Sequence, residues 1–287
     1  MPVSVVLIGR LGNQLFQLFT LMSYSMDFNL PFKLKRRKND MVSPGGSHRP
    51  TYWDNFLCNL SPYLDDDYIP EKRYTEPNFH FTQLPFLTEE VKVNFNMQLK
   101  GYFQSPKYFL HNLNKISQII RLDELKDKLY KKNKDLLKKD TISMHFRMGD
   151  FKKMTEHHTI LRFSYYKKAL KEIIKLTNKD DFLVLYCCEK EDEKKIDDYI
   201  RYIKKGFKRL KFKKMNLDMA DWEQMLMMSL CNHNIIANST FSWWGAFLNY
   251  NKDGNQKVIY PEKWFGNKLK HLNTNDLFPE RWIKISE

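Results

Sequence analysis

The sequence has 287 residues, which is long enough for one large or two moderate domains with a substantial core. Hydrophobic residues make up 42% of the chain and aromatic residues 15%, a composition that excludes an intrinsically disordered protein. The 48 Lys and Arg residues outnumber the 34 Asp and Glu residues, and the resulting net charge of +14 is compatible with nucleic acid or another anion as a ligand.

The first 139 residues are expected to form an α/β domain, because they open with a strand, a glycine turn and a helix. Ser105 is placed to cap a helix whose first residue is Pro106. Residues 50–90 are rich in aromatic residues and proline, and their pattern does not order the elements. The expected elements are a strand at 3–8, a helix from about 13 to 26, a strand at 31–34, a loop at 41–49 and a strand at 91–99.

The glycine turn of this domain carries the segment GRLGNQLFQ, from Gly9 to Gln17. Gly9 and Gly12 are spaced as in a nucleotide-binding turn, but the third glycine of that motif is missing. The side chains of Asn13 and Gln14 are better suited to hydrogen bonds with sugar hydroxyls. We therefore assign Gly12, Asn13 and Gln14 to a candidate sugar site.

A lysine-rich segment at 126–139 closes the first half of the chain. Leu122, Leu125, Leu129 and Leu136 recur there at helical spacing, so we expect an amphipathic helix with its lysines in solvent. No recognised nucleic-acid motif accompanies the charge, and we therefore favour a solvated face over a nucleic-acid interface.

From residue 140 onward, strands and helices alternate regularly. This alternation predicts a parallel sheet covered by helices on both faces, with functional loops at the carboxyl ends of its strands. This domain is expected to end near residue 265, and residues 266–287 are expected to pack back across both halves. Strands are expected at 141–146, 182–187, 234–237 and 257–260, and helices at about 164–176, 192–203 and 221–230.

The segment HFRMGDF, from His145 to Phe151, follows the first of these strands. Arg147 offers a planar fork of hydrogen-bond donors that suits phosphate oxygens, and Gly149 lets the backbone approach a ligand closely. The alternative is a structural ion pair at the strand end. Because His145, Gly149 and Asp150 stand beside it, we interpret Arg147 as an anion-binding residue.

The segment STFSWWGA, from Ser239 to Ala246, follows the strand expected at 234–237. A helix that begins here presents unpaired N–H groups and a partial positive charge to an anion. We therefore interpret Ser239, Thr240 and Ser242 as phosphate or ribose contacts, with a plain helix cap as the alternative. Two anion-binding segments at neighbouring strand ends indicate a diphosphate ligand.

Other chemical motifs are weak or absent. Asp65, Asp66 and Asp67 imitate the DxD of metal-dependent glycosyltransferases, but no clear strand precedes them, so we expect a surface turn. His157 and His158 have no partner cluster and are expected to face solvent. Signatures of P-loop NTPases, zincin proteases and α/β-hydrolases are missing, and no metal site is predicted.

The four cysteines lack the spacing of metal ligands. Cys187 and Cys188 lie in an apolar run and are expected to be buried free thiols, which favours a reducing compartment. The apolar run at 3–8 is too short for a signal peptide, and no run approaches the roughly 20 residues of a membrane span. We expect a cytoplasmic protein without a transmembrane span.

Taken together, these segments resemble the α-1,2-fucosyltransferase family, glycosyltransferase family 11. Its members typically carry a GGLGNQ-type N-terminus, an HxRRGD(Y) motif and an STFSWW-type motif. These motifs correspond here to residues 9–14, 145–151 and 239–244, and residues 101–104 (GYFQ) match a further segment of the family. The resemblance runs in consistent order from residue 3 to about residue 265.

The resemblance implies a GT-B fold, in which an acceptor-side domain at 1–139 and a Rossmann-like GDP-sugar domain at 140–265 face a central crevice. It implies inverting transfer of L-fucose from GDP-fucose to the 2-hydroxyl of a terminal galactoside. No metal and no cofactor besides the donor substrate is implied, and the candidate sugar site becomes the acceptor site. The residues that match donor contacts of the family are His145, Arg147, Ser239, Thr240 and Ser242.

The chain departs from the family pattern at Met148, which replaces a second arginine, as well as at Phe151 and Arg10. If the missing arginine gripped the donor, Met148→Arg is expected to tighten donor binding. If Arg10 or Arg162 fills that role, the substitution is expected to bring no gain.

Asp150 is the candidate general base, with a structural partnership to Arg147 as an equal alternative. Three other functions stay open. The protein could be a transferase of the same fold that uses another GDP- or nucleotide-deoxysugar or linkage, a basic nucleic-acid-binding protein, or a catalytically silent glycan-binding protein.

Overall fold

The computed structural model describes residues 1–36, 50–88, 96–249 and 254–286. The chain divides into two compact units, which we describe separately. The first contains Met1–Glu124 and Leu272–Pro279, and the second contains Leu125–His271 and Glu280–Glu287. Both are α/β units with parallel sheets, so the predicted α/β, GT-B-like class is confirmed, whereas the crevice between two domains stays a prediction.

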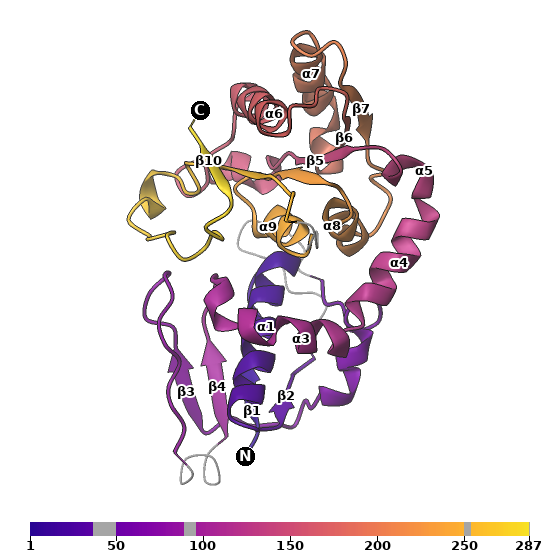
Figure 1. The fold of residues 1–287 in the computed structure, drawn as a ribbon. Coiled ribbons are helices and arrows are strands. Elements are labelled where there is room, and N and C mark those ends of the chain that lie inside the picture. The colour runs from indigo at the N-terminus through magenta and orange to yellow at the C-terminus, as the bar shows by residue number, and fades with distance from the viewer. Residues whose placement is uncertain (37–49, 89–95, 250–253, 287) are drawn as a thin grey trace. The chain divides into compact units, whose positions relative to one another are not determined.

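The first unit is built on a four-stranded parallel sheet of order β2-β1-β4-β3. Helix α1 (Leu11–Asp27) is buried along almost its whole length, because it packs against β1 and β2 on one side and against α3 (Leu113–Ile119) and two 3-10 turns on the other (Figure 1). The strands are β1 (Val3–Val5), β2 (Phe32–Lys33), β3 (Lys72–Thr75) and β4 (Met97–Lys100), and the 3-10 turns are η1 (Cys58–Tyr63), η2 (Pro106–Tyr108) and η3 (Leu110–Asn112).

The second unit holds a six-stranded parallel sheet of order β10-β9-β8-β5-β6-β7. Helices α6 and α7 cover one face of this sheet, and α8 and α9 cover the other (Figure 1). The strands are β5 (Thr141–His145), β6 (Leu183–Cys187), β7 (Lys211–Lys214), β8 (His233–Ile235), β9 (Val258–Pro261) and β10 (Ile283–Ile285). The helices are α6 (Phe163–Thr177), α7 (Glu193–Lys204), α8 (Asp221–Ser229) and α9 (Thr240–Phe247), preceded by α4 (Leu122–Lys132) and α5 (Lys134–Leu137), with 3-10 turns η4 (Gly149–Lys153), η5 (Lys190–Asp192) and η6 (Asn267–Leu269).

This strand order creates one topological switch point in the second sheet. The chain runs outward from β5 through β6 to β7, then returns to the other side of β5 and runs outward again through β8 and β9 to β10. In open parallel sheets of this type, ligands bind outside the carboxyl ends of the two strands that flank the switch point. Those strands are β5 and β8, which pair directly with Met144 opposite Ile235.

Most of the predicted elements of the second unit are confirmed within a few residues. Three strands were not predicted, two in the second unit and one in the first. Strand β7 has the sequence KFKK with two exposed lysines, and β3 has the sequence KRYT with three exposed residues. Both lie at an edge of a sheet, where strands need no apolar pattern. Strand β10 has only three residues. The predicted loop at 41–49 lies outside the described residues, and so does much of the strand predicted at 91–99.

The predicted domains assign residues 1–139 to the acceptor and residues 140–265 to the donor, and this assignment stays a prediction. The compact units divide after Glu124, earlier than the expected boundary at 139/140, so most of α4 belongs to the second unit. Residues 272–279 belong to the first unit and 280–287 to the second. At Ser105 the predicted cap is confirmed, since its side chain accepts a hydrogen bond from the Lys107 amide at 3.3 Å, although the element that follows is a 3-10 turn.

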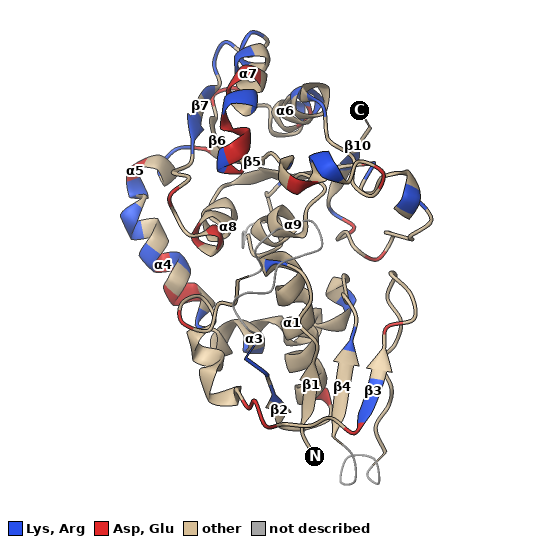
Figure 2. Ribbon diagram, turned by 180° about the vertical axis from the view of Figure 1, so that it is seen from behind, with Lys and Arg blue, Asp and Glu red and all other residues tan. Residues whose placement is uncertain are grey.

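The lysine-rich helix is amphipathic as predicted, with Leu122 and Leu129 buried and its lysines largely exposed. Figure 2 shows the Lys and Arg positions in blue along α4 and α5. Cys187 and Cys188 are free and buried, as predicted, and burial raises the pKa of the Cys188 thiol to about 12. No described helix combines the length and the hydropathy that crossing a membrane requires.

Met148 does not face the switch point. Its side chain is 1% exposed and belongs to the core of the second unit, together with Phe146, Leu161 and Tyr166. This burial favours the alternative in which an arginine here brings no gain in donor binding, and the effect on the donor stays a prediction. A guanidinium in this apolar core would lose its hydration.

We predict that Met148→Arg destabilises the protein by about 3 kcal/mol or more, because it forces a charge into this core. Met148→Leu, which conserves volume, is expected to cost less than about 1.5 kcal/mol. Urea unfolding of both variants and the wild type measures the difference. Equal stability of the arginine and leucine variants would contradict the buried placement.

Candidate functional site

Arg147 lies directly after β5, at the switch point, and its side chain is only 11% exposed. One terminal nitrogen of its guanidinium pairs with Asp150, three residues ahead on the same turn, and the other pairs with Glu189, which follows β6. The guanidinium carbon lies 4.8 Å from the centre of the Phe151 ring. The structural ion pair that was the alternative interpretation of Arg147 is therefore present in this structure.

The segment that follows β6 clamps the loop that follows β5. Asp192 is 1% exposed, and its Oδ2 accepts a hydrogen bond of 2.6 Å from the Gly149 amide. Its Oδ1 pairs with the Lys152 ammonium, which strongly favours the charged form and raises the pKa of Lys152. Buried carboxylates need such partners, since an unpaired charge in the core is costly.

Gly149 is required by this clamp. Its backbone φ is +30°, a value that residues with a side chain rarely adopt. A Cβ at this position would overlap the carboxylate of Glu189. Close approach at Gly149 was predicted, but with a ligand as the approaching group. In this structure the approaching group is Glu189, so the glycine makes room for the acid that holds Arg147.

The charges around Arg147 do not favour an anion in this arrangement. One guanidinium faces two carboxylates, Asp150 and Glu189, while Lys152 and Asp192 neutralise each other. An anionic ligand at Arg147 therefore competes with both carboxylates for the guanidinium. Glu189 is the more exposed of the two, at 28% against 19% for Asp150.

His145, the last residue of β5, connects this loop to the start of α9. The residue is 5% exposed, and its ring centre lies 5.2 Å from that of Phe241. Within the described residues, its Nδ1 is buried without a hydrogen-bond partner. Burial, followed by the charge of Arg147, lowers the pKa of His145 to about 3, so the imidazole is neutral at pH 7.

The start of α9 supplies the other side of the switch point. Ser239 is the N-cap residue, with extended backbone and no side-chain capping hydrogen bond. Ser239 and Thr240 are half-buried, whereas Ser242 is buried and its hydroxyl bonds to the carbonyls of Ala237 and Ser239 at 3.4 and 3.3 Å. The hydroxyl of Ser242 thus serves the helix start, and donor contacts by these residues stay predictions.

Three functional candidates were missed in the sequence. Glu189 and Asp192 follow β6, the strand next to β5, and this acidic segment at a strand end was the available signal. His158 was expected in solvent, but its ring stacks on Phe151 at 4.0 Å and 9°. Burial is the main cause that lowers the pKa of His158 to about 4. The expectation for His158 was wrong because Phe151, the local partner that covers it, was not considered.

The described residues offer one cluster that could hold a metal ion. Glu189, Glu191 and Asp192 each place a carboxylate oxygen within 4.8 Å of the others. Two of these three acids already pair with Arg147 and Lys152, so a cation would compete with both. Asp65 pairs with Lys33 at 3.2 Å, and Asp66 and Asp67 are exposed in a turn of the first unit, so the expected surface turn is confirmed.

The predicted acceptor residues lie in the first unit, at the start of α1. Gly9 has a φ of +83°, and the side chain of Asn13 packs against it. The Gln14 amide donates to the carbonyls of Gly9 and Pro50 at 3.1 and 3.0 Å, and Gly12 is buried in the first helical turn. These side chains shape the turn, and their role toward a sugar stays a prediction.

Comparison with known proteins identifies the family. A sequence model of glycosyl transferase family 11 matches residues 2–286. An Escherichia coli alpha-1,2-colitosyltransferase is 28% identical over 98% of both chains. The Escherichia coli O-antigen biosynthesis glycosyltransferase WbnK is 27% identical over 77% of this chain and 69% of its own. The chain belongs to glycosyl transferase family 11.

Two solved structures are similar to the whole chain at low identity. An Arabidopsis thaliana FUT1 variant in complex with GDP has a TM-score of 0.49 and 10% identity, over 91% of this chain and 70% of that one. A glycosyl transferase family 9 protein from Veillonella parvula has a TM-score of 0.48 and 7% identity, over 99% of this chain and 86% of that one.

We predict that Asp192→Ala destabilises the protein by about 3 kcal/mol, because it leaves the Lys152 ammonium and the Gly149 amide without their acceptor. Asp218→Ala is the matched control, since Asp218 also pairs with a lysine at 2.6 Å but is 78% exposed, and its loss should cost less than about 1 kcal/mol. Urea unfolding gives both values. Equal losses of unfolding free energy in the two variants would show that Asp192 does not hold the loop in place.

We also predict that acid weakens the fold through His145. The unfolded histidine takes up a proton near its ordinary pKa of 6.5, whereas the folded one resists protonation down to about 3, so stability is lost as the pH falls below 6.5. Between pH 7 and pH 5 this residue should account for a loss of about 2 kcal/mol. His145→Gln should flatten the dependence of unfolding free energy on pH. An unchanged slope would show that the imidazole is solvated.

Proposed function

We propose that this family 11 glycosyltransferase transfers L-fucose from GDP-fucose to the 2-hydroxyl of a terminal galactoside, with inversion at the anomeric carbon. The observation that carries the proposal is the meeting of Arg147 and the start of α9 at the switch point between β5 and β8. That is where a Rossmann-like sheet binds a nucleotide diphosphate. The proposed partners are therefore a GDP-sugar donor and a galactoside-terminated glycan acceptor.

Two chemical features suit this site to a diphosphate. The guanidinium of Arg147 can bind two phosphate oxygens with parallel hydrogen bonds. The first turn of α9 adds backbone N–H groups and the positive end of its dipole. As the bond to the sugar breaks, charge develops on the departing GDP, and each oriented donor contributes roughly 3–4 kcal/mol to the transition state.

The ion pairs of Arg147 bear on the general base. Asp150 pairs with the guanidinium on its own turn, and this supports a role in orienting Arg147 over a role as the base that activates the acceptor hydroxyl. In the proposed mechanism the diphosphate takes the place of Glu189 on the guanidinium, while Asp150 continues to orient the Arg147 side chain. Arg147 and α9 then neutralise the leaving group, so the proposed reaction needs neither a metal nor a cofactor besides the donor.

A second donor is a specific alternative. One relative is named an alpha-1,2-colitosyltransferase, and colitose is L-fucose without its 3-hydroxyl. A site that hydrogen-bonds the 3-hydroxyl rejects a donor without it by roughly four to five orders of magnitude, whereas an apolar pocket discriminates by about a hundredfold. The ratio of the two rates therefore tells which kind of pocket the sugar enters.

We predict that Arg147→Ala nearly abolishes transfer and that Arg147→Lys recovers little, because lysine keeps the charge but loses the planar fork. Both variants should fold, and both should lose thermal stabilisation by GDP. Arg201→Ala is the control, since that arginine is 73% exposed and pairs with Asp198 on the surface of α7. Near-wild-type turnover in Arg147→Ala would remove this residue from the donor site.

We further predict that GDP-fucose supports galactoside-dependent release of GDP, that UDP-sugars do not, and that EDTA leaves the rate unchanged. The assay compares GDP-fucose, GDP-colitose and UDP-galactose, each with and without a panel of terminal galactosides. Faster turnover of GDP-colitose would select the alternative donor. A strict need for manganese or magnesium would overturn the metal-free mechanism.

A further inference from the structure

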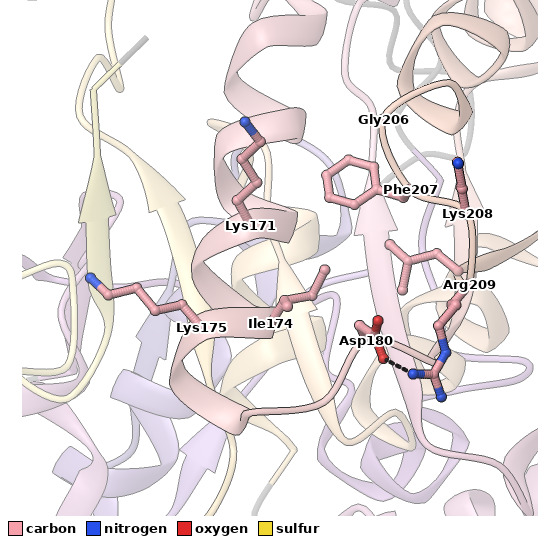
Figure 3. Close-up of a pocket in the computed structure, with 9 residues that line it drawn as sticks. Lys171, Ile174, Lys175, Asp180, Gly206, Phe207, Lys208 and Arg209 are labelled. Atoms are coloured by element: carbon pink, nitrogen blue, oxygen red, sulfur yellow. Dashed lines mark ion pairs between the residues drawn. The ribbon is translucent and has the colours of Figure 1, made fainter.

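A second surface feature of the same sheet lies near the amino ends of its strands, away from the switch point. A cavity of about 570 Å³ opens beside the amino ends of β6 and β7, between the C-terminal half of α6 and the turn at 206–210 (Figure 3). Arg147 and Ser239 follow the carboxyl ends of their strands, so this cavity is separate from the candidate active site.

The floor of this cavity is apolar and its rim is basic. Ile174, Phe207 and Leu210 form the floor, and the last two are only 9% and 7% exposed. Figure 3 shows lysines on α6 and on the facing turn, with the Lys175 side chain directed away from the floor. The basic residues of the rim are Lys171, Lys175, Lys208 and Arg209.

Two of the four rim cations are paired with acids, and one of them is Lys175, whose ammonium lies 3.8 Å from Glu172. Asp180 is the acid in its lining and pairs with Arg209 at 2.9 Å. Within the described residues, Lys171 and Lys208 form no ion pair and are exposed. A neighbouring hollow shares Arg209 and adds the cations Lys139 and Lys211. Its acids are Asp181 and Asp140, and Asp140 is paired to Lys179 at 2.6 Å.

We propose that these six cations form a docking surface for a bilayer that contains anionic phospholipids. We call this surface the basic edge. It is made of Lys139, Lys171, Lys175, Lys208, Arg209 and Lys211.

The spacing of the charges selects this occupant. The cations belong to separate segments near the amino ends of β6 and β7, and Figure 2 shows further Lys and Arg positions in blue along β7. Such a spread suits a surface of many headgroups, to which each nearby Lys or Arg adds binding energy. Single-stranded nucleic acid is instead bound on exposed aromatic platforms, whereas Phe207, the aromatic residue of this cavity, lies in its floor.

The proposal does not depend on the donor or the acceptor, because docking is measured without transfer. The wild type, Lys171→Glu/Lys208→Glu and Lys131→Glu/Lys134→Glu are each mixed with vesicles of phosphatidylcholine alone or with phosphatidylglycerol added, and sedimented. The second double variant is the matched control, since it makes the same charge change at exposed lysines of α4 and α5. Thermal unfolding checks that both variants are folded.

We expect the wild type to sediment with the phosphatidylglycerol vesicles alone and to be released by salt. The Lys171→Glu/Lys208→Glu variant should bind more than about 20-fold more weakly, and the control should stay within about twofold of the wild type. Equal losses in both variants would reduce the effect to net charge and overturn the proposal. Absence of vesicle binding, with RNA binding that is sensitive to Lys171 and Lys208, would assign the basic edge to nucleic acid instead.

Discussion

The chemistry of the second unit depends on how one largely buried guanidinium is held between carboxylates. Arg147 is oriented by Asp150 on its own turn and by Glu189 from the neighbouring strand end, and Asp192 fixes the loop that carries it. These contacts explain the glycine at 149, and the charge of the guanidinium adds to burial in lowering the pKa of His145. They also bear on donor binding, since a diphosphate competes with both carboxylates for the guanidinium.

The fold was largely predictable because the second unit is built from apolar strands that alternate with amphipathic helices. Strands β5 and β6 are buried at every position, and such runs are distinctive in a sequence. Strands β3 and β7 escaped prediction, since an edge strand can carry lysine at most positions. The strand order was not predictable from local patterns, yet it is what places the loops after β5 and β8 side by side.

The site was predictable only where its residues are close in sequence. Arg147 and the start of α9 are visible as motifs at strand ends, but the partner of Arg147 comes from 42 positions away. Only the pairing of β5 with β6 brings Glu189 and Asp192 to that loop. Met148 shows that adjacency in sequence is not enough. The family motif has an arginine at this position, next to Arg147, but in this chain the side chain at 148 lies in the core.

We propose that Arg147 exchanges a carboxylate for the donor diphosphate at the switch point, and a crystal structure of the protein with GDP would test this exchange. We expect the diphosphate within hydrogen-bonding distance of the Arg147 guanidinium and of the first amides of α9, with the Glu189 pair broken and the Asp150 pair retained. A nucleotide bound elsewhere, with both carboxylates still on Arg147, would contradict it.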